Sequence, residues 1–294
     1  MITAKSAAAQ RRLPATVRRA AASLVAGGTA LVGVGLTAPA AHAAEGDISF
    51  SNVVLNDGKP IVVGLSAEVE APLTYTVKSS VSLDDWWVEA YRTNGSTRYL
   101  LAISTTQWGC GTSSAGGYTF RDCDETMTID PDGMPGGNGN HLVNSDAAAW
   151  KTLGTAIKKN GGYDTDLLSA TVRLQRASRI QNANASPEPV AKGKPITVTG
   201  TVQRANWSRH RYDNYGDRLV KLQFKPAGFS SYSTVKTVTA SSTGYLKTSV
   251  TASQDGTWRW RYSGNTTTGA SNSSGDYVDV TLRPVPRSPR LTAQ

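Results

Sequence analysis

The segment from Gln203 to Arg218 combines cationic and aromatic side chains. The members best suited to bind a ligand are Arg204, Trp207, Arg209, Arg211, Tyr212 and Tyr215. Guanidinium groups attract anionic polymers, and aromatic rings stack on sugars or cations. We therefore predict a binding site for an anionic ligand here. The alternative is that Trp207 closes the edge of a β-sandwich while the arginines are only solvated.

A second group of chemically active residues is acidic. Asp122, Asp124, Asp130 and Asp132 lie within eleven residues and are followed by Gly133. Calcium prefers six to eight oxygen ligands, and glycine-rich loops allow carbonyl oxygens to converge on it. The spacing does not match the EF-hand loop. The segment is therefore a candidate calcium site, with a polar surface loop as the alternative; no other cofactor is indicated.

The residues of the chain do not form a familiar catalytic motif. His141 and His210 are the only histidines after residue 43, and no G-x-S-x-G, H-E-x-x-H or P-loop pattern occurs. A glycosidase pair of carboxylates remains an alternative, but Glu68 and Glu70 would lie on one face of a strand rather than opposite each other. We predict that the protein is not an enzyme, and a glycan-active enzyme is the less favoured reading.

The chain contains two cysteines, Cys110 and Cys123, with twelve residues between them. An even pair in an exported protein is typical of a disulfide. Closing so short a loop stabilises the fold by roughly 3 kcal/mol. We predict a Cys110–Cys123 disulfide with a structural role.

The first 43 residues have the pattern of a secretory signal peptide. A basic start is followed by an uncharged stretch from Ala20 to Ala41, which closes on the small-x-small sequence Ala41-His42-Ala43. We predict cleavage after Ala43 and a secreted, extracellular or cell-wall-associated product, with a retained membrane anchor as the alternative. No other segment is long and apolar enough to span a membrane. The anionic partner is then a cell-wall or extracellular polysaccharide and not nucleic acid, although nucleic acid fits the same chemistry.

The formal charge differs between the two halves of the chain that follows. Residues 44–175 contain nine Lys/Arg and 16 Asp/Glu, whereas residues 176–294 contain 17 Lys/Arg and six Asp/Glu. Opposite signs indicate two separate modules that attract each other, or a basic module that faces an acidic polymer.

The C-terminal half has apolar residues at every second position, which predicts half-buried antiparallel strands. The alternating runs are Ile196–Val202, Val220–Phe224, Leu246–Val250, Trp258–Tyr262 and Val278–Leu282, and Ser231–Val238 is a further strand. Turn-forming sequences such as Gln254-Asp255-Gly256 separate them. Six or seven short strands of this kind predict an immunoglobulin-like or fibronectin-like sandwich.

Several short sequences in this half also occur together in a known family. They are Asn184-Ala-Ser-Pro-Glu-Pro-Val190, Ile196-Thr-Val-Thr-Gly200, Arg204-Ala-Asn-Trp207, Val220-Lys-Leu-Gln-Phe224, Ser242-Thr-Gly244 and Asp255-Gly-Thr-Trp-Arg259. In this order they resemble the C-terminal module of secreted two-module proteins of high-GC Gram-positive bacteria, a family whose functions are mostly uncharacterised and some of whose members are called calcium-binding. The resemblance covers residues 176–283 well and the N-terminal region only in outline. It implies an Ig-like fold and no catalytic residue.

The N-terminal half is also predicted to be mainly β. The expected strands are Ile48–Leu55, Ile61–Val69, Leu73–Val81, Trp86–Thr93, Arg98–Ser104, Tyr118–Ile129 and Leu167–Leu174. Trp150, Leu153 and Ile157 have helical spacing, and Gly161 follows them, so we expect one short helix over Asp146–Lys159. The module boundary is expected near 176–183.

Together these patterns predict an all-β protein with two tandem antiparallel β-sandwich modules. The expected divisions are a signal peptide over 1–43, a disulfide-linked β-rich module over 44–175, an Ig-like sandwich over 184–283 and a disordered tail over 284–294. The favoured function is a secreted, non-enzymatic binding protein for anionic polymers of the cell envelope or the extracellular space. The alternative is a calcium-stabilised structural secreted protein.

Overall fold

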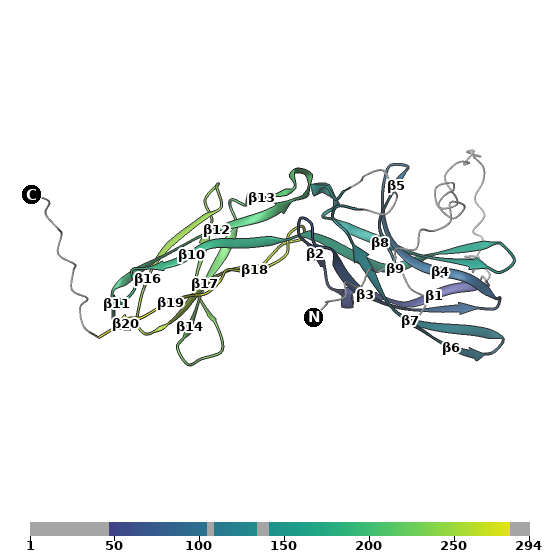
Figure 1. Ribbon diagram of the computed structural model, residues 1–294, viewed down its shortest axis with the longest axis horizontal. Coiled ribbons are helices and arrows are strands. Elements are labelled where there is room, and N and C mark those ends of the chain that lie inside the picture. Colours follow the sequence, from purple (N-terminus) through teal and green to yellow (C-terminus); the bar gives the residue numbers. More distant parts are fainter. Residues whose placement is uncertain (1–46, 105–108, 134–140, 283–294) are drawn as a thin grey trace, which may run out of the picture.

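The computed structural model describes residues 47–104, 109–133 and 141–282. The predicted signal peptide and the predicted C-terminal tail over 284–294 lie outside these residues. The described chain is all-β, as predicted: strands form two sandwiches arranged end to end along the long axis of the molecule (Figure 1). Among the described residues, no helix has the length and apolarity needed to cross a membrane.

The N-terminal module consists of two facing sheets. One has the order β1-β3-β7-β6, and the other has the order β2-β9-β8-β4-β5. The strands are β1 (Ile48–Leu55), β2 (Ile61–Val63), β3 (Val69–Ser79), β4 (Leu83–Asn94), β5 (Thr97–Ile103), β6 (Cys110–Ala115), β7 (Tyr118–Ile129), β8 (Ala149–Lys158) and β9 (Tyr163–Arg176). Short 3-10 turns, η1 (Asn56–Gly58) and η3 (Asn144–Asp146), lie in the connections.

Large side chains from both sheets fill the space between them. Trp150 is fully buried, and the rings of Phe50 and Tyr75 lie 6.0 Å apart, centroid to centroid. A Cβ atom at Gly154 would come within 2.5 Å of the Phe50 ring. The glycine therefore allows Phe50 to pack directly on the central strand of the opposite sheet.

The predicted helix over Asp146–Lys159 is wrong. Residues 149–158 form strand β8, which pairs with β4 on one side and with β9 on the other. Trp150 and Ala156 face the core with the period of two that a strand requires, and the spacing of Trp150, Leu153 and Ile157 only imitates a helix. Two flanking strands would lose their partner if this segment were helical, so tertiary pairing decides its conformation.

The predicted disulfide is confirmed. Cys110 and Cys123 are directly opposed in the β6–β7 hairpin, and their Cα atoms are 4.0 Å apart. Gly116 and Gly117, both with positive φ, make the two-residue turn of this hairpin. The disulfide therefore closes the open end of the hairpin that forms one edge of the sheet.

The C-terminal module is a smaller sandwich. In one sheet β12 pairs with β10, β13 and β16, and the other has the order β15-β14-β17-β18, with β19 also on β17. The strands are β10 (Ser178–Ser186), β11 (Val190–Ala191), β12 (Pro195–Asn206), β13 (Arg211–Asn214), β14 (Leu219–Pro226), β15 (Ser233–Thr239), β16 (Tyr245–Thr251), β17 (Gly256–Tyr262), β18 (Ser271–Asn272), β19 (Asp276–Val278) and β20 (Val280–Thr281). The 3-10 turn η4 (Trp207–Arg209) connects β12 to β13.

This module has the layout of an Ig-like sandwich. After β10 the chain leaves the sheet of β10 and β12, and the short strand β11 pairs in parallel with the last strand, β20. Trp260 is fully buried, and its indole N–H donates to the Thr199 carbonyl oxygen of the facing sheet at 2.7 Å. A Cβ atom at Gly200 would lie 2.9 Å from the same indole ring. Trp260 thus ties the two sheets together.

The two modules are joined by an almost continuous strand. Only Ala177 separates β9 from β10; its N–H donates to the Val63 carbonyl at 2.8 Å, and its carbonyl accepts the Ala205 N–H at 2.8 Å. Both flanking backbones therefore hydrogen-bond to this one residue. The first strand of the C-terminal module begins at Ser178.

Candidate functional site

Trp207, the central aromatic residue of the predicted binding segment, is buried between the modules. Only 3% of its surface is exposed, and its indole N–H donates to the Gly64 carbonyl of the N-terminal module at 2.7 Å. Its backbone N–H donates to the Asn144 side chain at 3.1 Å, and Asn144 also donates to Asn206 at 2.8 Å. Because the Trp207 ring is buried in this junction, it offers no stacking surface to a ligand.

Arg204 and Tyr215 also belong to the junction. The Arg204 guanidinium lies 4.1 Å from the centroid of the Tyr215 ring and donates to Thr268. Arg176, at the end of β9, is only 6% exposed, and its Nε atom has no hydrogen-bond partner. We call Arg176, Arg204, Tyr215 and Thr268 the junction cluster. Its arginines face protein groups rather than solvent.

The junction cluster changes the acidity of its own members. Burial, together with the charge of Arg204, lowers the pKa of Arg176 to about 10. Burial opposes ionisation of Tyr215, but hydrogen bonds from Thr268, Tyr262 and Asn265 and the charge of Arg204 outweigh it and lower the pKa of Tyr215 to about 8. The pKa of the neighbouring Tyr262 is raised by burial and by Tyr215. Of these two phenols, Tyr215 therefore loses its proton first as the pH rises.

The other members of the predicted segment have partners within the protein. Arg209 and Arg211 are exposed, but both pair with Asp213, at 3.4 Å and 2.8 Å. A hydrogen bond from Asn206 and the two arginines keep the pKa of Asp213 low. The Tyr212 ring is covered by the Arg179 guanidinium, 4.0 Å from its centroid. The segment is therefore mainly a structural connection between the modules.

The four predicted calcium ligands do not converge. Asp122 and Asp124 lie on the exposed side of β7, where Asp122 accepts a hydrogen bond from Thr76 at 2.7 Å. Asp130 follows the strand, roughly 20 Å further along the chain, and accepts the Asp132 N–H at 2.8 Å. Asp132 itself lies 3.4 Å from the His210 ring.

Only one group of three metal-type ligands comes together in the described segments, and it consists of Cys110, Cys123 and Glu125. Both of its sulfur atoms are held in the disulfide. Burial raises the pKa of the Glu125 carboxyl above its ordinary value. This group is therefore part of the packing around the disulfide.

A group of cations without carboxylate partners among the described residues lies on the outer face of the sheet β15-β14-β17-β18. Lys221 and Lys225 point outward from β14, and Arg259 and Arg261 point outward from β17, while the alternate residues Leu222 and Trp260 fill the core. We call these four cations the cationic sheet face. Across the described residues, no carboxylate forms an ion pair with any of them.

The strand register places two of these charges directly against each other. Lys221 is opposite Arg261 in the antiparallel β14–β17 pair. Like charges at directly opposed positions destabilise a sheet by up to about 1 kcal/mol. Packing does not explain such a pair, because both side chains face outward. A negatively charged ligand lying across the two strands would remove the repulsion.

An aromatic ring completes one end of the cationic sheet face. The Arg259 guanidinium lies 3.7 Å from the centroid of the Tyr232 ring, and the Lys225 ammonium lies 5.3 Å from it. The Nε atom of Arg259 also donates to Gln223 at 3.0 Å. These contacts fix the guanidinium on the surface while its charge stays unneutralised, an arrangement that suits recognition of anions.

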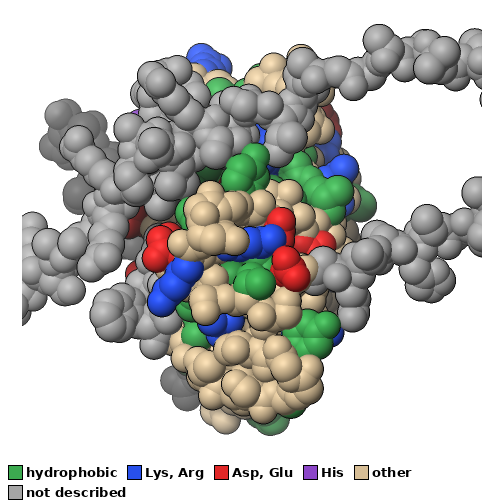
Figure 2. All heavy atoms as spheres, turned by 90° about the vertical axis from the view of Figure 1, so that its right-hand side faces the viewer, with side chains coloured by type: hydrophobic (Ala, Val, Ile, Leu, Met, Phe, Trp, Pro, Cys, Tyr) green, Lys and Arg blue, Asp and Glu red, His purple; other side chains and the backbone are tan. Residues whose placement is uncertain are grey.

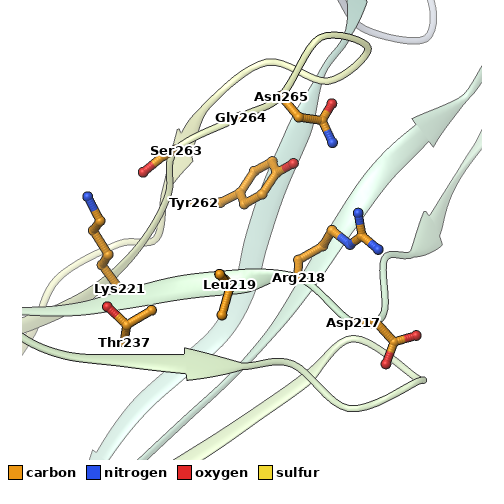
Figure 3. Close-up of a pocket in the computed structure, with 9 residues that line it drawn as sticks. All are labelled: Asp217, Arg218, Leu219, Lys221, Thr237, Tyr262, Ser263, Gly264 and Asn265. Carbon is orange, nitrogen blue, oxygen red and sulfur yellow. The ribbon is translucent and has the colours of Figure 1, made fainter.

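The opposite end of the face opens into a pocket of about 430 Å³ (Figure 3). Its lining residues are Asp217, Arg218, Leu219, Lys221, Thr237, Tyr262, Ser263, Gly264 and Asn265. Lys221 belongs to both the cationic sheet face and the pocket, so the two form one continuous site. Figure 3 shows Lys221 and Arg218 on opposite sides of Tyr262.

The end of the N-terminal module that lies away from the C-terminal module differs in charge from the cationic sheet face. In Figure 2, which looks onto that end, the visible described surface is largely uncharged, and Lys/Arg and Asp/Glu side chains lie next to one another near its centre. Lys158, for example, pairs with Asp164 at 2.9 Å and with Asp47 at 3.3 Å. Charges of opposite sign neutralise each other there, unlike those on the cationic sheet face.

The cationic sheet face is not among the sites that the sequence predicts. Its signal was present in Val220-Lys-Leu-Gln-Phe224 and Trp258-Arg-Trp-Arg-Tyr262, where every second residue is apolar and the residues between include three of the four cations. Alternation showed that these cations face outward. It did not show that β14 and β17 are neighbours, and only that pairing brings Lys221 and Arg261 together.

A scan against protein-family models and a search of curated proteins both find no match. Among solved structures, the D00-D0 domain of intimin aligns with 15% identity over 79% of this chain and 98% of its own, with a TM-score of 0.25. Dimeric latent PorU from Porphyromonas gingivalis aligns at 10% identity over 80% of this chain and 20% of its own (TM-score 0.25). The N-terminal eight Ig domains of Down Syndrome Cell Adhesion Molecule align at 9% identity over 79% of this chain and 36% of their own (TM-score 0.29). At such scores these likenesses carry no argument about function.

Proposed function

We propose that this protein is a secreted, non-enzymatic binding protein that holds anionic polysaccharide on the cationic sheet face of its C-terminal module. The observation that carries the proposal is the set of four outward cations without a carboxylate partner, two of them directly opposed across β14 and β17. A polyanion lying across these strands neutralises charges that the fold leaves unpaired. The Cys110–Cys123 disulfide is compatible with an extracellular location.

The proposed binding surface is the cationic sheet face and not the segment 203–218 that the sequence predicts. Arg209 and Arg211 already have Asp213 as partner, and Trp207 is buried at the junction, so the segment 203–218 has little free binding capacity. The cationic sheet face supports the same class of ligand with different residues. Envelope polymers of Gram-positive bacteria, which carry phosphate or carboxylate groups, are the partners we propose.

Co-sedimentation with isolated Gram-positive cell walls tests this proposal. We expect the protein to pellet with the walls at low salt and to return to the supernatant at high salt, because exposed charges are screened within about 10 Å at 0.1 M salt. The double variant Arg259→Gln/Arg261→Gln should stay in the supernatant at low salt. The matched control Arg209→Gln/Arg211→Gln removes two arginines from the junction segment and should pellet like the wild type.

Two results would overturn the proposal. The first is wild-type protein that remains in the supernatant at every salt concentration. The second is equal loss of sedimentation in both double variants, which would mean that net charge alone matters and that the cationic sheet face is not a defined site.

A further inference from the structure

The pocket in Figure 3 differs from the rest of the cationic sheet face because it combines charge with an apolar surface. Leu219 lies next to Lys221 on the outward side of β14, and it is 67% exposed. An exposed leucine between cations adds nothing to the binding of a bare phosphate or carboxylate. It does suit the apolar C–H face of a sugar ring, which needs an apolar contact as well as polar partners.

Polar groups that match sugar hydroxyls surround this leucine. Thr237 lies on β15, and Ser263 and Asn265 lie in the loop that follows β17. Asp217, the one carboxylate in the lining, is exposed and provides an acceptor for a hydroxyl group. Hydroxyl, amide and carboxylate groups around an apolar floor are typical of a site that orients a small polar ligand.

The charge in the pocket favours an anionic sugar over a neutral one. The Nε atom of Arg218 donates to the Gly216 carbonyl at 2.9 Å, which holds the guanidinium in place, while its terminal nitrogens have no hydrogen-bond partner in the described part of the chain. Lys221 is likewise without an ion pair there. Charge-assisted hydrogen bonds from two such donors to a carboxylate or phosphate are the strong contacts that the pocket has available.

The wall of the pocket is held by the N-terminal module. The Asn265 carbonyl accepts the Gln175 side-chain N–H of β9 at 2.6 Å, and the Asn265 side chain donates to the Tyr215 hydroxyl at 2.8 Å. The loop is therefore ordered before a ligand arrives, which lowers the entropy cost of binding. The volume of about 430 Å³ falls within the range of roughly 300–1,000 Å³ for small-ligand sites.

We infer that this pocket receives one acidic sugar unit, with Leu219 beneath the ring and with Arg218 and Lys221 on its carboxylate or phosphate group. The inference rests on the proposed function, because the same unit would belong to the polymer bound along the cationic sheet face. It adds a preference: a sugar that carries an acid should bind better than either the acid or the sugar alone.

Calorimetric titration of the full protein with short ligands tests the inference. The probes are trigalacturonate, glucose 1-phosphate, neutral maltotriose and inorganic phosphate. We expect trigalacturonate or glucose 1-phosphate to bind at least about tenfold more tightly than maltotriose, which lacks the charge-assisted contact. The same difference is expected from inorganic phosphate, which lacks the apolar contact of a sugar ring with Leu219. The two acidic probes distinguish a carboxylate-bearing unit from a phosphate-bearing one.

Four variants locate the binding. Lys221→Met removes a charge and keeps the alkyl stem, and Leu219→Ser removes the apolar floor; each should weaken the acidic probe about tenfold. Lys247→Met, on β16 of the other sheet, and Leu167→Ser, a leucine that is 75% exposed in the N-terminal module, are the matched controls and should bind like the wild type. All four side chains are exposed, so the substitutions leave the core intact.

The remaining outcomes separate this inference from the proposed function. Equal binding of maltotriose, or of inorganic phosphate, would overturn the acidic-sugar pocket. No binding of either acidic probe by protein that still sediments with cell walls would overturn the pocket and leave the cationic sheet face standing. Failure of both the short probes and the cell walls would overturn both proposals.

Discussion

Two groups of arginines, one at the junction of the modules and one on the cationic sheet face, have opposite roles. In the junction cluster, the Arg204 guanidinium lies over the Tyr215 ring and donates to Thr268, and Arg176 is buried with its backbone hydrogen-bonded to Thr267 and Gly269 of the C-terminal module. On the cationic sheet face, Arg259 and Arg261 are fixed by Gln223 and Asn272 on one side and keep their charge toward solvent. Both groups have aromatic neighbours, so an aromatic contact does not show whether an arginine can bind a partner. What differs is whether the guanidinium is enclosed by other groups of the protein or faces solvent.

The same comparison applies to aromatic residues. Trp207 and Tyr215 are almost completely covered at the junction, whereas Tyr232 lies at the surface under Arg259 and Lys225. Cation–π contacts occur in both places. At the junction they fill the interior, and on the sheet face they hold a charged group in position for an external anion.

Truncation of Trp207 should have the largest effect on the junction. Trp207→Ala removes a buried indole and its hydrogen bond to Gly64, and we expect a loss of about 3–5 kcal/mol in the free energy of unfolding. Differential scanning calorimetry should show a lower Tm and separation of the two modules into distinct transitions. A loss below about 1 kcal/mol with a single unchanged transition would mean that Trp207 does not couple the modules.

Replacement of one arginine from each group should have different effects on stability and on polyanion binding. Arg204→Gln loses the contact with Tyr215 and the hydrogen bond to Thr268, and we expect about 1–2 kcal/mol of destabilisation with unchanged binding of polyanions. Arg261→Gln should weaken polyanion binding without lowering the Tm. Chemical denaturation and cell-wall sedimentation of both variants check this. The reverse pattern would exchange the roles assigned to the two groups.

The junction cluster should also make stability depend on pH. The pKa of Tyr215 is lowered to about 8, whereas an unfolded tyrosine titrates near about 10. Between these values the unfolded state retains a proton that the folded state has lost, so stability should rise with pH from about 8 to 10. Above this window Tyr262, whose pKa is raised by burial and by Tyr215, keeps its proton only in the folded state, which lowers stability. Arg176, whose pKa is lowered to about 10, loses its proton only in the folded state and acts in the opposite direction.

Urea denaturation of the wild type and of Tyr215→Phe at a series of pH values measures this effect. The variant should lose the rise between about pH 8 and 10. A rise of equal size between about pH 8 and 10 in the variant would assign the effect to another residue. Arg259→Gln, in the other group of arginines, should leave the pH profile as in the wild type.

Relief of the opposed charges should have the smallest effect. Replacement of Arg261 by threonine puts a β-branched neutral residue opposite Lys221, and we expect a gain of a few tenths of a kcal/mol at low salt that disappears at high salt. Equilibrium denaturation at two salt concentrations measures it. A destabilised variant at low salt would show that the Lys221–Arg261 pair is not repulsive.

The fold was largely predictable because most strands show apolar and polar residues at alternating positions. The bounds of β1 and β7 agree with those expected, and Trp258–Tyr262 lies within β17. Strand β6 was missed because Cys110-Gly-Thr-Ser-Ser-Ala115 has no apolar alternation; its partner β7 and the disulfide define it. The sequence of β8 predicts a helix because the spacing of Trp150, Leu153 and Ile157 is helical, and only pairing with β4 and β9 makes this segment a strand.

The site was less predictable, for a related reason. Residues that are close along the chain, such as Arg209 and Arg211, stand out in a sequence, but both pair with Asp213, which offsets one of their two positive charges. Lys221 and Arg261 are forty positions apart and meet only through the β14–β17 register. The acidic group failed in the same way, since extension of β7 carries Asp124 away from Asp130 instead of folding them around an ion.

The dependence of polygalacturonate affinity on salt concentration tests the central claim most directly. Affinity of the wild type, measured from about 0.05 to 0.5 M NaCl, should fall steeply, because exposed charge pairs are screened over this range. Arg259→Gln/Arg261→Gln should start weaker and show a shallower slope, whereas Arg209→Gln/Arg211→Gln should follow the wild type. Identical slopes for the two double variants would contradict the assignment of binding to the cationic sheet face.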